Sequence, residues 1–405
     1  MKILIVLPRF PYPLEKGDKL RAYHQIVQLA KRNDVYLFAV SHQRVSDEHR
    51  AALEPHCREI RIVTPPRWVS YKNVLRNYLC TKSLQLGYWD SQRARRACKQ
   101  FISQVDPDVI YSQMVRTMPL VARADYPKVM DFQDALSLNT ERRMEQSKGF
   151  WRYVLHFEFK MLRSAEYKAM RIFDRLTIIS EADRDAIPHR QSDNIRVVPN
   201  GVDLDYFSGQ RSVVSGQSAD ADSAHSQLTD LVFCGNMQYE PNIDAARFLV
   251  NEIMPLVWER RPETTLTLAG ATPKKAVREL ASDRVTVTGT VPDIRPYYSA
   301  AKVFVAPMRI GSGLQNKLLE AMAMGIPCVT TPLAGDTLGA EDGKHLLIGT
   351  TAQQLADALL ALLADTTRRT LMASEAHSFV QQNYTWDNIG NQLESILHEA
   401  TDRHL

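Results

Sequence analysis

Short apolar runs alternate with longer amphipathic stretches in the first half of the chain. The runs are rich in Val and Ile, which is typical of parallel strands buried on both faces. The stretches repeat apolar residues every three or four positions, as helices do, most clearly over 19–32 and 151–173. This alternation predicts βαβ units. The six predicted strands are 2–7, 34–40, 59–64, 108–113, 128–133 and 175–180.

The same alternation starts again in the second half. Apolar runs at 231–236, 264–270, 284–289, 302–307, 327–331 and 345–349 predict six more strands, with helices near 242–259, 293–300 and 314–325. A chain of 405 residues suits two domains of nearly equal size. The predicted fold class is therefore α/β, with two Rossmann-like, doubly wound domains. We expect them to face a cleft at the carboxyl ends of their strands, where such folds bind ligands.

Changes in composition place the predicted boundaries. The N-terminal domain is expected over 1–180 and the C-terminal domain over 181–384. Within the latter, 208–230 is small and polar and predicts a flexible insertion. The tail, 385–405, carries an apolar stripe and needs a surface to pack on, since a lone helix of this length is marginal in water. We expect it to cross back to the N-terminal domain.

Composition excludes several classes of protein. No 18 apolar residues run together, and the opening apolar stretch, 3–7, is too short for a signal peptide. Five scattered cysteines without a C-x-x-C pair argue against a disulfide framework or a zinc site and favour a reducing compartment. The net charge of +4 does not imply nucleic acid. We expect a cytoplasmic protein.

Segment 58–99 is more basic than the rest of the chain. It holds ten Lys or Arg against two acids, interleaved with Trp and Tyr. One interpretation is a solvated helical surface, the commoner outcome for charge runs. The other is peripheral contact with the inner face of an anionic membrane, whose headgroup layer suits such side chains.

The most informative stretch is 307–325, PMRIGSGLQNKLLEAMAMG. A buried strand ends, a turn containing Gly311, Ser312 and Gly313 follows, and a helix opens. Glycines let backbone N–H groups approach a ligand, and a helix N-terminus favours anions. Lys317 and Arg309 could neutralise a diphosphate, while Glu320, on the same helix face as Lys317, could accept hydrogen bonds from sugar hydroxyls. The alternative is a tight turn followed by a surface Lys–Glu pair.

Other candidates are weaker. Gly17 and Asp18 lie in the loop that opens the first helix, and Asp131 and Asp134 follow a buried strand. All four are expected near the ligand edge of the N-terminal domain, on the acceptor side. Two D-x-D sequences, 203–205 and 220–222, are discounted as metal ligands because of their linker and insertion contexts. The histidines show no zinc spacing. We predict no metal and no cofactor.

Four segments give the chain a family resemblance. The stretch GSGLQNKLLEAMAMGIPCVT (311–330) resembles the signature of family 4 glycosyltransferases, which are retaining enzymes of the GT-B fold. Segment 175–207, which contains NGVD, is similar to the family's crossing between domains. Segment 284–307 is similar to the region before the family's donor site. The opening, with KGDKLR (16–21), resembles sugar transferases associated with PEP-CTERM/exosortase exopolysaccharide systems.

The resemblance implies a metal-independent hexosyltransferase. Its donor would be a nucleotide-diphospho-sugar bound by the C-terminal domain. Its acceptor would be a glycan or a lipid-linked molecule bound by the N-terminal domain. Glu320 matches the second glutamate of the family's E-x7-E motif, and Lys317 and Gly313 match its phosphate-binding turn and helix. The catalytic candidates are Glu320, Lys317 and Arg309, and the donor-binding candidates are Gly311, Ser312, Gly313, Leu314, Asn316 and Gly235.

The chain departs from the family pattern at three places. Ser312 stands where the first glutamate of E-x7-E would fall. GNMQYEPN (235–242) lacks the Arg and Lys that many relatives carry after the first strand of the C-terminal domain, and 108–113 offers no histidine. Two alternatives therefore stay open: a nucleotide-sugar 2-epimerase, and a non-catalytic nucleotide-sugar-binding partner of a polysaccharide complex. The epimerase would need a cluster of acids and histidines for proton abstraction, which is not visible beside 311–320.

Overall fold

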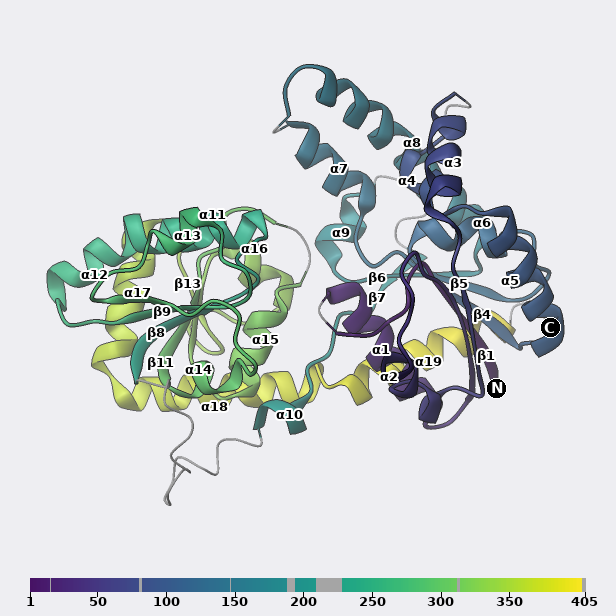
Figure 1. Ribbon diagram of the computed structural model, residues 1–405. Helices are drawn as coiled ribbons and strands as arrows, with labels where there is room; N and C mark the ends of the chain where they lie inside the picture. The colour runs from purple at the N-terminus through teal and green to yellow at the C-terminus, as the bar shows by residue number, and fades with distance from the viewer. Residues whose placement is uncertain are drawn as a thin grey trace. The chain divides into compact units, whose positions relative to one another are not determined.

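The chain folds into two compact α/β units. The computed structural model describes residues 1–14, 16–79, 82–145, 147–187, 194–208, 228–311 and 314–402. The N-terminal unit comprises Met1–Asn200 together with Trp386–Leu405, and the C-terminal unit comprises Gly201–Thr385 (Figure 1). The predicted boundary after residue 180 is therefore wrong by twenty residues. The predicted insertion at 208–230 lies mostly outside the described residues.

The N-terminal unit is built on a seven-stranded parallel sheet in the order β3-β2-β1-β4-β5-β6-β7. Its last strand was not predicted, and this strand explains the shifted boundary: β7 pairs with β6 through Leu176 and Ile195. The strands are β1 (Lys2–Leu7), β2 (Asp34–Val40), β3 (Glu59–Val63), β4 (Val109–Gln113), β5 (Lys128–Asp131), β6 (Arg175–Ile178) and β7 (Ile195–Val197).

Helices cover both faces of this sheet. Side chains alternate along a strand, so Ile3, Ile5 and Leu7 of β1 enter one core and Leu4 and Val6 enter the other. The first core lies under α1 and α19, and the second lies under α5 and α8. The described helices are α1 (Gly17–Ala30), α2 (Asp47–Ala51), α3 (Arg67–Leu79), α4 (Leu84–Trp89), α5 (Gln92–Val105), α6 (Met118–Val121), α7 (Leu136–Glu145), α8 (Phe150–Ile172), α9 (Glu181–Asp185) and α19 (Trp386–Asp402), with short 3₁₀ turns at Glu54–His56 and Val115–Thr117.

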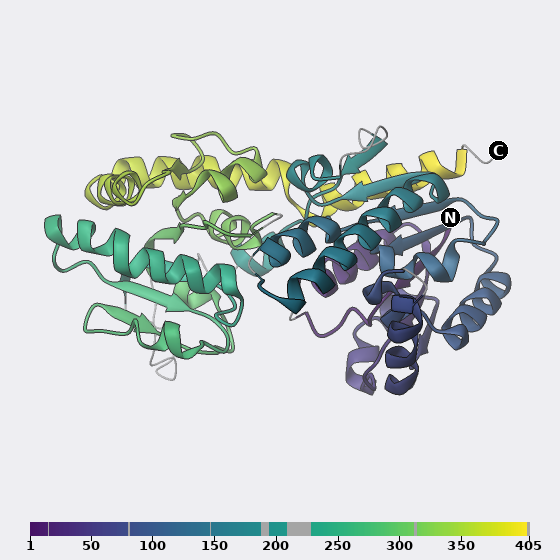
Figure 2. The ribbon, with the colours of Figure 1, turned by 90° about the horizontal axis from the view of Figure 1, so that it is seen from above.

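The C-terminal helix α19 packs on the N-terminal unit, alongside α1 and against its sheet (Figures 1 and 2). Its apolar stripe is buried in the core that contains β1. The Trp386 ring stacks on His24 of α1 at 4.5 Å between centroids. The two helices approach closely at Gly390, where an added Cβ would lie 2.6 Å from the Cβ of Gln28.

Deletion of residues 386–405 is expected to destabilise the N-terminal unit, because it would expose the apolar face that α19 covers. Backbone amides of β1 and β4 should lose protection in hydrogen exchange. A truncated chain whose N-terminal unit keeps native protection would show that α19 adds nothing to that unit's stability.

The C-terminal unit has a six-stranded parallel sheet in the order β10-β9-β8-β11-β12-β13. Its strands are β8 (Thr229–Cys234), β9 (Leu266–Ala269), β10 (Val285–Val287), β11 (Ala301–Ala306), β12 (Cys328–Thr330) and β13 (Leu347–Ile348). Its described helices are α10 (Leu204–Ser208), α11 (Glu240–Phe248), α12 (Met254–Arg260), α13 (Lys275–Arg278), α14 (Arg295–Ser299), α15 (Asn316–Ala323), α16 (Pro332–Gly335), α17 (Ala352–Ala364) and α18 (Thr366–Asn383), with a 3₁₀ turn at Asp336–Leu338.

The helix predicted over 242–259 is interrupted. A π-helical segment, Leu249–Ile253, separates α11 from α12. Pro255 lies in the first turn of α12. Proline has no N–H to donate to the preceding turn, so a regular α-helical ladder cannot run through this point.

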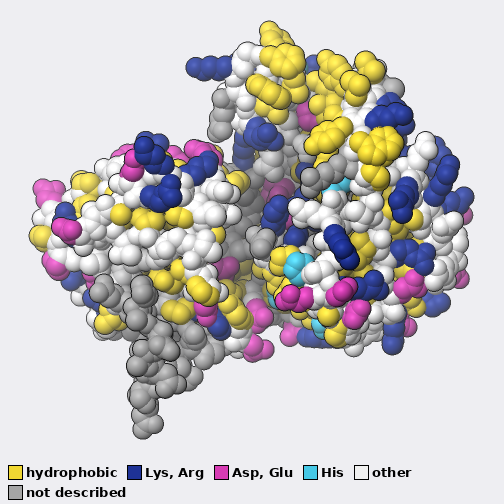
Figure 3. All heavy atoms as spheres, in the orientation of Figure 1, with side chains coloured by type: hydrophobic (Ala, Val, Ile, Leu, Met, Phe, Trp, Pro, Cys, Tyr) yellow, Lys and Arg dark blue, Asp and Glu magenta, His cyan; other side chains and the backbone are white. Residues whose placement is uncertain are grey.

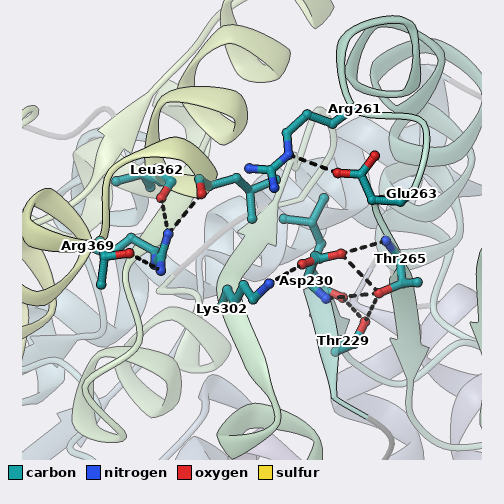
Figure 4. A network of polar contacts seen from close by, with 11 residues as sticks. Thr229, Asp230, Arg261, Glu263, Thr265, Lys302, Leu362 and Arg369 are labelled. Atoms are coloured by element: carbon teal, nitrogen blue, oxygen red, sulfur yellow. Dashed lines mark hydrogen bonds and ion pairs between the residues drawn. The ribbon is translucent and has the colours of Figure 1, made fainter.

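A polar network joins the amino ends of the three central strands (Figure 4). Asp230 on β8 accepts a hydrogen bond from Lys302 Nζ of β11 at 2.7 Å and another from the backbone N–H of Thr265, just before β9, at 3.0 Å. Burial raises the pKa of the Asp230 carboxyl, but the hydrogen bonds from Lys302 and Thr265 lower it overall. The network fixes the strands at the end opposite the candidate site.

Candidate functional site

The strand order of the C-terminal unit fixes where a ligand would bind. β8 and β11 are neighbours at the centre of the sheet, and the strands that follow each of them are added outward in opposite directions. In doubly wound sheets, ligands bind beyond the carboxyl ends of the strands at this point of reversal. The segments that follow β8 and β11, 235–242 and 307–316, therefore bound the candidate site.

Two glycines bring the backbone together at this edge. An added Cβ on Gly270, after β9, would lie 1.7 Å from the carbonyl oxygen of Gly235, after β8. A Cβ on Gly235 would lie 2.8 Å from the amide nitrogen of the Asn242 side chain. That amide donates to the carbonyl of Asn236 at 2.9 Å. The side-chain oxygen of Asn242 is thereby turned toward Lys317.

Lys317 lies at the reversal point. Its Nζ donates to Asn242 Oδ1 at 2.5 Å and lies 3.7 Å from Met308 Sδ, so it contacts the segments after both central strands. It also sits over the Phe233 ring, 4.9 Å from the centroid. Burial lowers the pKa of Lys317 to about 8, although Glu320 opposes that shift. The result is a partly desolvated cation, the kind of group that binds a diphosphate strongly.

Glu320 lies one turn farther along α15. Its Oε2 accepts a hydrogen bond from the Tyr298 hydroxyl at 2.9 Å. Burial raises the pKa of the Glu320 carboxyl, while Tyr298 and Lys317 oppose the shift. Tyr298, on α14, is itself fully buried. Lys317 and Glu320 are both partly buried, and each is held by a side chain from another helix, so they do not form the exposed surface pair of the alternative interpretation.

Arg309 is held in a different way. Its guanidinium forms ion pairs with Asp244 of α11 at 2.8 Å and with Glu252 at 3.3 Å, and it lies 4.1 Å from the centroid of the Phe248 ring. Two carboxylates already neutralise this cation. The structure therefore places Lys317 at the reversal point with Glu320 one turn farther along α15, and it directs Arg309 toward α11 and the π-helical segment.

The predicted turn is described only in part. Gly311 has a φ of +133°, a conformation that strains any residue with a Cβ, so glycine is required there. Ser312 and Gly313 lie outside the described residues. Leu314 is buried, and Asn316 is the first residue of α15.

The acceptor-side candidates have different environments. Gly17 begins α1, and an added Cβ would meet no atom within 4 Å, so packing does not require glycine there. Asp18 forms an ion pair with Arg9 Nε at 3.0 Å. Asp134 is partly exposed, and burial, followed by the charge of Asp183, raises the pKa of its carboxyl to about 7.

Asp131 does not lie where an acceptor could reach it. The residue is fully buried, and its two oxygens accept hydrogen bonds from Arg21 at 2.7 and 3.2 Å. Tyr111 and Thr177 donate to the same carboxylate at 3.0 and 3.1 Å. This carboxylate compensates a buried cation, and its acceptor-side role stays a prediction.

Arg21 was not singled out from the sequence, although it ends the KGDKLR motif. It is 1% exposed. Besides Asp131, it donates to the carbonyl of Pro199 at 3.0 Å and to Asn200 Oδ1 at 3.1 Å. Arg21 thus connects α1 and β5 with Pro199 and Asn200, the last residues of the N-terminal unit before the chain enters the C-terminal unit.

Metal ligands are absent from the described residues: no three His, Cys, Asp or Glu side chains there could hold an ion together. Asp203, in the first D-x-D sequence, accepts a hydrogen bond from the backbone N–H of Tyr206 at 2.9 Å in the first turn of α10. This contact is a helix cap. The second D-x-D lies outside the described residues.

The chain is similar to known glycosyltransferases in both units. Residues 20–206 match the family described as "Glycosyltransferase Family 4", and residues 229–365 match "Glycosyl transferases group 1". These matches place two glycosyltransferase domains in succession in one chain. Together with the two parallel sheets and the solved structures that resemble them, they define a glycosyltransferase of the GT-B fold.

Individual relatives are distant. An "Uncharacterized 44.6 kDa protein in cps region" from Klebsiella pneumoniae is 20% identical over 95% of this chain and 96% of its own length. The D-inositol 3-phosphate glycosyltransferase of Corynebacterium aurimucosum is 30% identical over 55% of each chain. The crystal structure of Anabaena HepE in complex with UDP-glucose has a TM-score of 0.66 and 18% identity, covering 98% of this chain and all of HepE.

Proposed function

We propose that the chain is a retaining hexosyltransferase that moves a sugar from a nucleotide-diphospho-sugar to a glycan or lipid-linked acceptor. The observation that carries the proposal is the position of Lys317, a partly desolvated cation at the strand-reversal point of the group 1 domain. A structural neighbour, HepE, has been solved with UDP-glucose, which supports a nucleotide-sugar donor. The resemblance of KGDKLR to exopolysaccharide transferases supports a role in exopolysaccharide or cell-surface polysaccharide synthesis.

The proposed chemistry needs stabilisation of a leaving diphosphate. Lys317 and the N-terminal end of α15 would supply positive charge as the glycosidic bond to the diphosphate breaks. Glu320, held by Tyr298, would accept hydrogen bonds from hydroxyls of the bound donor. In this proposal these groups take the part that a divalent metal plays in other transferases, so no metal is required.

Incubation of the purified chain with labelled nucleotide-sugars and a panel of glycan and lipid-linked acceptors tests the proposal. We expect a transfer product whose anomeric configuration matches that of the donor, formed equally in buffer with EDTA. An epimerised nucleotide-sugar would indicate the 2-epimerase, and binding without turnover would indicate the non-catalytic partner. Loss of activity in EDTA that Mn²⁺ or Mg²⁺ restores would overturn the metal-independent mechanism.

A further inference from the structure

Exposed apolar side chains are concentrated on two helices of the N-terminal unit. Of the thirteen large hydrophobic residues exposed in the described part of the chain, eight lie on α3 or in the first turn of α8. Such side chains are usually scattered singly over a protein surface, and a concentration of them marks an interaction site. We call these eight the aromatic surface: Trp68, Tyr71, Leu75, Tyr78, Leu79, Phe150, Trp151 and Tyr153.

The two helices are tied together. The ring of Tyr78 on α3 lies 5.5 Å from that of Phe157 on α8. Glu158 of α8 accepts hydrogen bonds from the Ser83 hydroxyl and the Leu84 N–H at 2.7 Å, and so caps α4, which packs on α3. Both helices are seen when the molecule is viewed from above (Figure 2), and yellow side chains gather along that upper end of the unit, with Lys and Arg beside them (Figure 3).

A basic groove adjoins the aromatic surface. It has a volume of about 920 Å³ and is lined by parts of α3, α5, α6 and α8. Seven cations line it against two acids, and one of those acids, Asp90, is already paired with Arg95. Its apolar lining includes Leu86, Ile102 and Met161. The cations are Arg76, Lys82, Arg95, Arg96, Lys99, Arg123 and Lys168.

We propose that the aromatic surface and the basic groove together dock this chain on an anionic phospholipid bilayer. Trp and Tyr occupy the headgroup layer because their rings are apolar at one end and polar at the other, and Lys and Arg beside them attract anionic lipid phosphates. A second copy of the chain would bring the same positive charge against the groove, so charge complementarity favours the bilayer. No described helix is long and apolar enough to cross it. Contact is therefore peripheral.

Segment 58–99, which is basic and aromatic in the sequence, forms α3, α4 and most of α5. It therefore contains part of the aromatic surface and part of the basic groove. The remainder, Phe150, Trp151 and Tyr153, lies more than fifty residues later and joins the surface only in the fold. Docking does not depend on the proposed sugar transfer, because vesicle binding is measured without donor or acceptor.

Co-sedimentation of the full chain with vesicles tests the inference. We expect binding to vesicles of phosphatidylcholine with phosphatidylglycerol and little binding to phosphatidylcholine alone, with affinity falling as salt increases. Trp68→Ala/Trp151→Ala should weaken binding about tenfold for each ring removed. Arg96→Glu/Lys99→Glu should weaken it by at least as much. The matched controls are Leu371→Ala and Lys275→Glu/Lys344→Glu, at exposed positions of the C-terminal unit, which should bind as the unchanged chain does.

These residues are exposed, so circular dichroism melts should be unchanged and folding failure should not confound the result. The inference would be overturned by a lack of binding to anionic vesicles or by equal binding of the variants and the unchanged chain. A concentration-dependent dimer that the tryptophan variant abolishes, without any binding to vesicles, would also overturn it. Selective capture of nucleic acid in place of vesicles would do so as well.

Discussion

Replacing Lys317 by Met is expected to lower kcat/KM for the nucleotide-sugar about 10- to 100-fold. The side chain contacts the segments after both central strands and would contribute a charge-assisted contact to the diphosphate, worth about 1.5–3 kcal/mol. Methionine keeps much of the volume and removes the charge. Lys344→Met, an exposed lysine near the amino end of β13, is the matched control and should keep full activity. An unimpaired Lys317→Met enzyme would show that the donor binds elsewhere.

The same lysine predicts a pH dependence with a definite sign. Burial lowers the pKa of Lys317 from its ordinary value of 10.5 to about 8, so the free enzyme loses this charge as pH rises through about 8. We expect kcat/KM for the anionic donor to fall there, since this ratio reports groups of the free enzyme. Lys317→Arg should abolish the fall, because arginine stays protonated. A profile that is flat for both enzymes would contradict this role.

The stability of the ligand-free protein should move in the opposite direction. Between about pH 8 and 10.5 the unfolded chain holds the Lys317 proton and the folded chain does not. The free energy of unfolding therefore rises with pH over this interval as far as this group is concerned. Comparing urea melts of the unchanged chain and Lys317→Met at both ends of the interval isolates the contribution.

Replacing Asp131 by Ala is expected to destabilise the N-terminal unit by about 3–5 kcal/mol, because it leaves the Arg21 guanidinium buried without its counter-charge. Arg21→Met should be similarly damaging. The double variant Arg21→Met/Asp131→Leu should lose less than the sum of the two single changes, since it removes both buried charges. Chemical denaturation measures all three.

This experiment separates a structural carboxylate from an acceptor ligand. If Asp131→Ala left the free energy of unfolding unchanged and raised only KM for the acceptor, the structural role would be wrong. Asp18→Asn is a suitable comparison, because its carboxylate is partly exposed and paired with Arg9. Its effect on unfolding should be small.

The apolar runs of the sequence were sufficient to predict twelve of the described strands. Parallel strands that are covered on both faces consist of nearly continuous apolar residues, so they stand out in the sequence. β7 was missed although β10 and β12 are equally short, because 175–207 was interpreted as the crossing between the domains. The interrupted helix at Leu249–Ile253 had a local signal, Pro255, that was overlooked.

The candidate site was predictable as far as it is local. Lys317 and Glu320 are three residues apart on one helix, so their shared face follows from helix geometry. Arg309 was equally close in sequence, but its direction is set by Asp244 and Glu252, which lie more than fifty residues earlier. Asn242 and Tyr298, the partners of Lys317 and Glu320, are likewise distant in sequence. Such partners follow from tertiary packing and leave no local pattern.

The buried pairing of Asp131 could not be predicted for the same reason. Asp131 is the last residue of β5, and many ligand-binding carboxylates lie at the carboxyl end of a strand. Its partner Arg21 is 110 residues earlier, and only the fold buries the two together. The sequence did hold one signal for the Arg21–Asp131 pair. Arg21, in KGDKLR, lies on the inward face of a predicted helix, where a buried arginine needs a carboxylate partner.

Hydrogen exchange with and without nucleoside diphosphates is the most direct test of the central claim, that the segments after β8 and β11 and the start of α15 bind the donor diphosphate. UDP and GDP should be tried in turn on the unchanged chain and on Lys317→Met. We expect the diphosphate that binds to protect backbone amides in 235–242 and 308–320, and we expect Lys317→Met to lose this protection at the same ligand concentration. Protection confined to the N-terminal unit, or protection that Lys317→Met retains in full, would contradict the account.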